Sequence, residues 1–135
     1  MAQYAFNPLA RHLDLVNNPA HTAFVVETMV GGQRMVILNQ QGKLLHADHT
    51  IPDHAGRIVG LTLTSGVAGA TVIVCRFGLV VDPAWQWDAA KPRLFLSSNG
   101  TLTQTVPTTG FVCVVGHCIS ATQLFIDIQP AINLT

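Results

Sequence analysis

The chain has 135 residues, of which 49% are apolar and only 10% are charged, and its formal net charge at pH 7 is zero. This composition excludes a disordered chain, and it argues against a nucleic-acid-binding protein, which normally carries a basic surface. The length fits one domain with one core. Because a neutral surface with few charges favours association, we expect copies of the protein or a partner to cover part of it.

Residues 1–20 predict an extended arm in front of a folded domain of residues 21–135. Asn and Pro recur in this segment and its periodicity is weak, yet it contains many apolar side chains. We expect it to lie across a neighbouring subunit and to add backbone hydrogen bonds at a sheet edge. An ordinary first strand, packed on its own domain, is the alternative. The interface candidates in the arm are Tyr4, Phe6, Leu9 and Leu13.

Short apolar runs between turn residues predict an all-β fold, either a single antiparallel β-barrel or a jelly-roll-like β-sandwich. The abundance of Val, Ile and Thr favours strands as well. Residues His21–Val30 are ambiguous between helix and strand, and their composition slightly favours a strand or irregular structure. The predicted strands are Met35–Asn39, Lys43–Ala47, Arg57–Thr64, Thr71–Phe77, Leu79–Asp82, Arg93–Ser97, Leu102–Val106, Phe111–Cys118 and Gln123–Gln129.

The clearest hairpin is predicted around Ser98-Asn99-Gly100, between the strands that begin at Arg93 and end at Thr105. Asn-Gly readily adopts the positive φ angles that tight hairpin turns require. The strand that follows the turn alternates Thr with other residues, which is typical of an edge strand with a hydroxyl-rich face. Beyond the last strand, Pro130–Thr135 is a candidate for a second, shorter arm.

Three histidines and two aspartates lie between His46 and His54, and imidazole and carboxylate groups are ligands of zinc and other divalent metals. Their spacing matches no defined zinc motif. The weak metal candidates are His46, His49 and His54. The alternative interpretation is a polar surface loop whose histidines bind the backbone or a neighbouring subunit.

Cysteines occur at positions 75, 113 and 118, and an odd number argues against a disulfide framework. We expect reduced, mostly buried thiols. His117 and Cys118 are adjacent on a predicted strand, so their side chains should point to opposite faces and cannot form a catalytic dyad. We expect no catalytic residue and no cofactor.

Trp85 and Trp87 form the most distinctive aromatic feature and lie two residues apart. Tryptophan is enriched at the centres of protein interfaces, so both are interface candidates. A loop that closes one end of the core and a sugar-stacking platform are the alternatives.

From Ala55 to Ser120 the chain resembles the small β-rich structural proteins of tailed-bacteriophage virions. The similarity lies in Ala55-Gly-Arg-Ile-Val-Gly-Leu-Thr, Gly66-Val-Ala-Gly-Ala-Thr-Val-Ile-Val and Phe77-Gly-Leu-Val. It continues in Trp85-Gln-Trp87 and in the run from Pro92 through Asn99-Gly-Thr-Leu-Thr-Gln-Thr to Gly116-His-Cys-Ile-Ser. His117 and Cys118 depart from the pattern, which has small or apolar residues there. Capsid decoration (cement) proteins are the members closest in length.

The resemblance implies a non-enzymatic virion protein that binds the outside of the major capsid protein shell and stabilises the head. Its expected partners are the major capsid protein and itself, as a homodimer or homotrimer, with no nucleic acid and no membrane. It would be made in the host cytoplasm and reside on the capsid surface. A head-fibre or tail module that contacts the host is one alternative, and a metal-binding protein or enzyme built on His46, His49 and His54 is the other.

Overall fold

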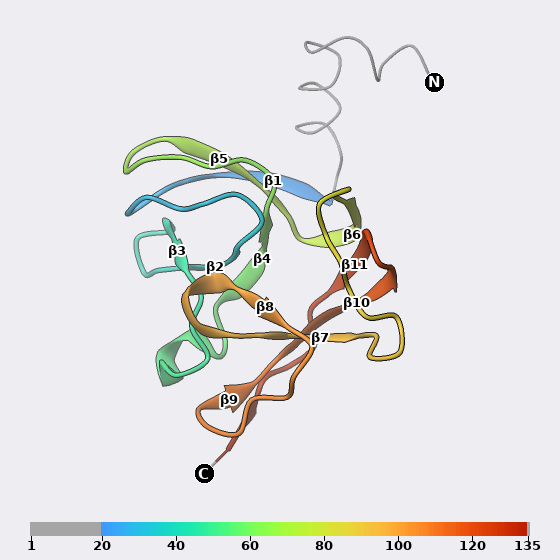
Figure 1. The fold of residues 1–135 in the computed structure, drawn as a ribbon. Helices are drawn as coiled ribbons and strands as arrows, with labels where there is room; N and C mark the ends of the chain where they lie inside the picture. Colours follow the sequence, from blue (N-terminus) through green and yellow to red (C-terminus); the bar gives the residue numbers. More distant parts are fainter. Residues whose placement is uncertain (1–19, 135) are drawn as a thin grey trace, which may run out of the picture.

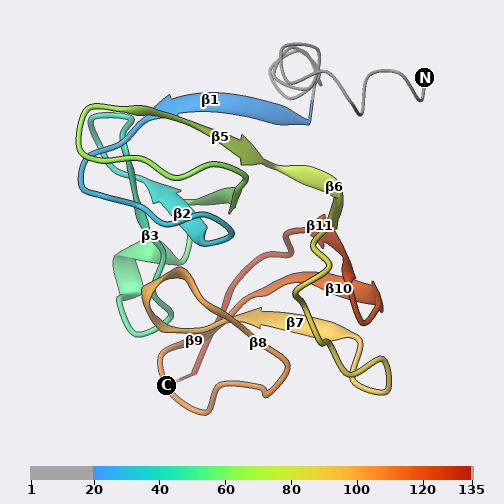
Figure 2. The same ribbon diagram turned by 45° about the horizontal axis from the view of Figure 1, so that its top comes forward.

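The structure is a computed structural model and describes residues 20–134. These residues form two five-stranded sheets and one two-stranded ribbon, in which all strand pairings are antiparallel. Figures 1 and 2 show the two larger sheets as separate layers, which form a sandwich rather than a closed barrel. The predicted all-β fold is confirmed in its sandwich form. Residues 1–19, which hold nearly all of the predicted arm, lie outside the described part of the chain.

Strands that are neighbours in a sheet are often far apart in the sequence. The first sheet has the order β1 (His21–Val25), β5 (Thr71–Cys75), β4 (Ile58–Thr62), β2 (Met35–Leu38) and β3 (Leu44–His46). The second has the order β6 (Phe77–Val81), β11 (Gln123–Asp127), β10 (Val114–Ser120), β7 (Arg93–Leu96) and β8 (Leu102–Thr103). The ribbon pairs β12 (Ile132–Asn133) with β9 (Phe111–Val112), and two short 3₁₀ turns are η2 (Pro52–His54) and η3 (Ser98–Gly100).

The main core lies between the two sheets. Met35 and Ile37 face it from the first sheet, and Leu124 and Ile126 face it from the second. A second, smaller core covers the other face of the first sheet, where Val26 and Val30 fold over it. The first sheet is therefore buried on both faces. The side chains of this second core are Val26, Val30, Val36, Leu44, Val72 and Val74.

The ambiguous segment His21–Val30 begins as strand β1 and then becomes irregular. After the strand, the chain makes single bridges to β3 through Val26 and to Gly66 through Val30. Burial of these two valines explains why the segment is neither a helix nor a longer strand, since tertiary contacts replace a regular ladder.

The prediction of one strand over Phe111–Cys118 is wrong. The structure has two strands there, β9 and β10, and they are separated at Cys113. β9 pairs with β12, whereas β10 pairs with β7 and β11. The two halves have different partners, so the ladder must break between them. β12 also shows that Ile132–Asn133 belongs to the folded domain and not to a second arm.

The predicted hairpin is confirmed by the pairing of β7 with β8 across η3. Asn99 has φ 55° and Gly100 has φ 75°, as the Asn-Gly pair predicts. β8 is shorter than predicted, because the Thr103 hydroxyl accepts a hydrogen bond from the Thr105 backbone N–H (3.1 Å), which turns the chain away. β8 is nevertheless an edge strand, as expected.

Strands β5 and β6 are separated by one residue and carry the chain from the first sheet to the second. Cys75 faces the main core and so does Val80, although strict alternation would place them on opposite faces. Phe77, Leu79 and Val81 are exposed and alternate regularly with the buried Val80, so the break in alternation lies at Arg76, between the two strands. This change of phase leaves Phe77, Leu79 and Val81 on the outer side.

Candidate interaction surface

The outer face of the second sheet is apolar and exposed, and we call it the outer apolar face. On β6 the exposed fractions of Phe77, Leu79 and Val81 are 53%, 51% and 53%. Phe125 on the neighbouring strand lies directly opposite Leu79 in the β6–β11 ladder. An exposed apolar group of this kind typically marks a contact site. The outer apolar face comprises Phe77, Leu79, Val81, Ile119 and Phe125.

Three aromatic rings form a row across this face, one from each of the neighbouring strands β6, β11 and β10. The Phe77 and Phe125 ring centroids lie 5.1 Å apart in an edge-to-face contact. The His117 ring stacks on the other side of Phe125, at 5.6 Å. These contacts hold the Phe125 ring at the centre of the face, so the surface is formed before any partner binds.

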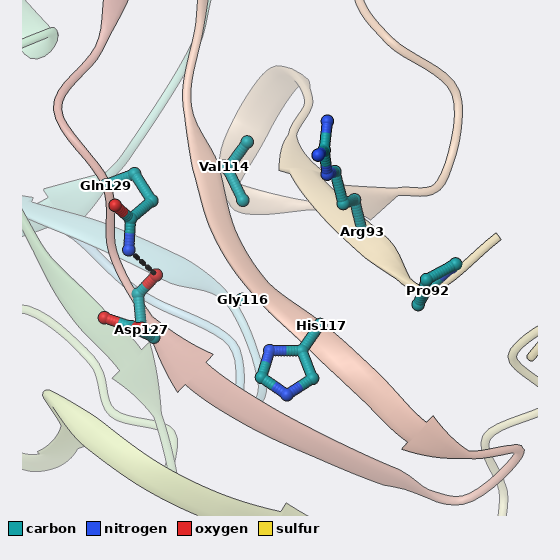
Figure 3. A pocket seen from close by; sticks show the side chains of 7 residues that line it. All are labelled: Pro92, Arg93, Val114, Gly116, His117, Asp127 and Gln129. Atoms are coloured by element: carbon teal, nitrogen blue, oxygen red, sulfur yellow. Dashed lines mark hydrogen bonds between the residues drawn. The ribbon is translucent and has the colours of Figure 1, made fainter.

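A hollow of about 380 Å³ adjoins the His117 ring, and Figure 3 shows the side chains that line it. His117 comes from β10, Arg93 from β7 and Asp127 from β11. Gln129 Nε2 donates to the Asp127 backbone oxygen at 3.3 Å. A cation, a carboxylate and an imidazole thus give the outer apolar face a polar border, which is the anatomy of a protein interface.

β6 also leaves one backbone edge unpaired within residues 20–134, because it is the terminal strand of its sheet. The Asp82 N–H donates to the Thr122 oxygen at 3.0 Å, in register with the β6–β11 ladder. Bonding alternates along an antiparallel ladder, so Gly78 and Val80 face β11. The backbone groups of Phe77, Leu79 and Val81 therefore face away from the sheet. Exposed edges of this kind are templates for pairing with another strand.

Trp85 and Trp87 lie in the loop after β6, and both are half-buried against the main core. Their ring centroids are 5.7 Å apart. The backbone N–H of Trp87 donates to the Ala121 backbone oxygen. The indole Nε1 of Trp87 is buried and has no hydrogen-bond partner among the described residues. This placement favours the interpretation of the loop as a cover for one end of the core. An interface role for the two tryptophans stays a prediction.

The three candidate metal ligands are each bound to a different part of the backbone. The Gly31 N–H donates to His46 Nε2 at 3.1 Å, and the Asp48 N–H donates to His54 Nδ1 at 3.1 Å. His49 Nδ1 lies 3.1 Å from the Thr109 oxygen. Over residues 20–134 no group of three or more His, Cys, Asp or Glu side chains is placed to hold a metal ion. His46 and His49 thus contact the backbone of distant segments, and His54 contacts the backbone within its own segment, in line with the alternative of histidines that bind the backbone.

Asp48 organises this loop. Burial raises its pKa, but hydrogen bonds from Thr50 and Asn99 outweigh that effect, and the pKa lies below its usual value. Burial lowers the pKa of His54, and the nearby Asp48 and Asp53 oppose this only in part. A neutral His54 can accept the Asp48 N–H, so the loop is built around an uncharged imidazole.

The cysteines are buried and unpaired, as predicted. Burial raises the pKa of Cys113 to about 11 and also raises that of Cys75, so both favour the unreactive thiol form. Cys118 is buried while its neighbour His117 is exposed, which confirms that they point to opposite faces of β10.

The arm candidates Tyr4, Phe6, Leu9 and Leu13 lie outside the described residues. Sequence reasoning missed the outer apolar face. Phe77-Gly-Leu-Val-Val has no alternation of polar and apolar residues, so nothing local separates its outer side from its inner side.

No protein-family model and no curated protein matches the sequence. Among residues 20–134, no helix is long and apolar enough to cross a membrane.

Proposed function

We propose that this protein is a non-enzymatic structural protein of a bacteriophage virion, made in the host cytoplasm, that decorates the outside of the capsid. The observation that carries the proposal is the outer apolar face, in which Phe77, Leu79 and Val81 are about half exposed. A decoration protein needs an adhesive surface on a rigid core. The resemblance to virion proteins between Ala55 and Ser120 supports the same role.

The partner is the major capsid protein, with Phe125 at the centre of the contact. Contacts repeated over a lattice raise the effective concentration of each next contact, so a modest patch per copy is sufficient. A protein that binds only the assembled shell stabilises that shell by mass action. The polar border at Arg93, His117 and Asp127 would set the orientation of the bound protein.

Co-sedimentation with purified heads that lack the protein tests the proposal. The wild-type protein should bind saturably. Phe125→Ser should weaken binding tenfold or more, which corresponds to ~1.4 kcal/mol. The matched control is Val67→Ser, since Val67 is 65% exposed but lies in the loop before β5.

Two outcomes would overturn the proposal. Heads that bind no protein at any concentration would exclude decoration of the capsid. Equal binding by Phe125→Ser, with an unchanged thermal midpoint, would exclude the outer apolar face as the contact. Immunogold labelling at the tail instead of the head would favour a fibre or tail module.

A further inference from the structure

The free edge of β6 lacks the features that normally protect an edge strand. Its five residues, Phe77–Val81, include no Lys, no Pro and no charged side chain. Its pairing with β11 is regular over its whole length. Within residues 20–134 no strand pairs with this edge, so the backbone groups of Leu79 and Val81 are available to a second strand. The Phe77 oxygen accepts from Cys75 Sγ at 3.5 Å and keeps its second lone pair for a further hydrogen bond.

We propose that β6 pairs with β6 of a second copy, antiparallel about a two-fold axis at Leu79, so that the two second sheets join into one continuous sheet. The sequence predicts a homodimer or a homotrimer, and this geometry selects a closed, two-fold dimer. The inference goes beyond the proposed virion role and does not depend on it.

The backbone geometry of the free edge fits this register. In antiparallel pairing about Leu79, Leu79 lies opposite the partner's Leu79, and Phe77 lies opposite the partner's Val81. These are the residues whose N–H and C=O groups face the free edge, so each opposed pair can exchange two hydrogen bonds. All three side chains lie on one face, so pairing also doubles the outer apolar face.

Charge complementarity favours a second copy as the occupant of this edge. Arg76 precedes β6 and Asp82 follows it, at equal distances from Leu79. The same register therefore places Arg76 opposite the partner's Asp82 at both ends of the paired strands. Opposite charges facing each other across strands stabilise a pairing.

The two charged groups are available for this contact. Arg76 is exposed, and its guanidinium forms no ion pair among the described residues. Asp82 accepts hydrogen bonds from Gln33 Nε2 and from the Ala84 N–H, which fix the carboxylate in place and hold its pKa below the usual value. It is therefore ionised at neutral pH and retains lone pairs for an arginine.

Disulfide cross-linking of the full-length protein tests the register. Leu79→Cys should form a covalent dimer on mild oxidation, because hydrogen-bonded antiparallel pairs have Cα atoms about 5.5 Å apart, within the range of a disulfide. Val81→Cys is the matched control, since two copies of residue 81 would be about 13 Å apart. A mixture of Phe77→Cys and Val81→Cys should cross-link. The native cysteines are buried and do not compete.

Sedimentation equilibrium tests the association itself. The wild-type protein should be a dimer. In Leu79→Lys the dissociation constant of the dimer should rise at least tenfold, because the substitution places two like charges together on the two-fold axis. Val67→Lys should leave the constant unchanged. Arg76→Glu, which reverses the charge, should weaken the dimer, whereas Arg76→Lys, which keeps the charge, should dimerise like the wild-type protein.

Several results would overturn the inference. A monomer at all concentrations, including one whose β6 edge is covered by residues 1–19 of the same chain, excludes the dimer. A trimer excludes the two-fold axis, and equal cross-linking of Leu79→Cys and Val81→Cys excludes the register. Capsid binding is a separate readout, so failure of the dimer and failure of the virion role are distinguishable.

Discussion

The two five-stranded sheets contain similar apolar strands, yet one is buried on both faces and the other on only one. In the first sheet, Val36 and Val74 point away from the main core and are still completely buried. In the second, Leu79 and Val81 point away from the same core and are about half exposed. The difference lies in Val26 and Val30, which fold over the first sheet. Apolar character thus indicates a need for cover, and the cover itself comes from elsewhere in the chain or from a partner.

The first prediction has the largest expected effect, and it compares the truncation of a residue in the main core with that of a residue on the outer apolar face. Leu61→Ala removes a fully buried side chain and should lower the free energy of unfolding by about 2–5 kcal/mol. Leu79→Ala, measured in dilute solution where the protein is monomeric, should change it by about 0.5 kcal/mol or less. Urea unfolding of both variants checks this. Equal losses would mean that β6 is covered within the monomer.

The second prediction tests the smaller core on the far side of the first sheet. Val74→Thr replaces a methyl group by a hydroxyl where exposure is zero, and should cost about 1–3 kcal/mol. Val81→Thr makes the same change on the outer apolar face and should be neutral to within about 0.5 kcal/mol. The thermal midpoints of the two variants provide the comparison. A neutral Val74→Thr would show that the first sheet is open on this side.

The third prediction concerns the polar contacts that join the two sheets at one edge. The Asn99 oxygen Oδ1 lies 2.9 Å from His46 Nδ1, and the Asn99 backbone has φ 55°. Asn99→Ala loses the contact and strains the turn, with an expected cost of about 1–2 kcal/mol. Asn99→Gly loses only the contact and should cost less. If glycine proves as destabilising as alanine, the backbone conformation is not the source of the effect.

The smallest effect is a dependence of stability on pH. Because the pKa of His54 is lower in the folded protein than its ordinary value of 6.5, its contribution is complete above pH 6.5 and is lost as the pH falls toward the folded pKa. The slope from one proton is at most about 1.4 kcal/mol per pH unit. Asp48 acts in the same direction but only below its ordinary value of 3.8, so the two windows are separate.

Urea unfolding between pH 7 and pH 5 measures the contribution of His54. His54→Asn retains an acceptor for the Asp48 N–H without the titrating ring, and it should flatten the profile in this range. An unchanged profile would show that another histidine is responsible.

The sequence predicted the fold class and several local features because each depends on neighbouring residues. Asn99-Gly100 specifies a turn through backbone preferences, and the hairpin forms where it was expected. The alternation of His117 and Cys118 follows from strand geometry alone. The histidines were expected in one polar surface loop, but His46 ends strand β3 and His54 is buried in η2. Their partners, Gly31, Asn99 and Thr109, were not predictable, because each comes from a distant segment.

The sequence by itself determined an antiparallel β protein with buried thiols and few charges, since backbone preference, strand alternation and composition are encoded locally. Only the tertiary structure decided that β5 and β6 belong to different sheets, that the alternation of side chains breaks at Arg76, and that Phe77, Leu79 and Val81 remain exposed. The physical reason is that burial is a property of pairs of surfaces. A strand of uniformly apolar residues has the same sequence pattern whether one face or both are covered, and the covering segment lies elsewhere in the chain or in a second molecule.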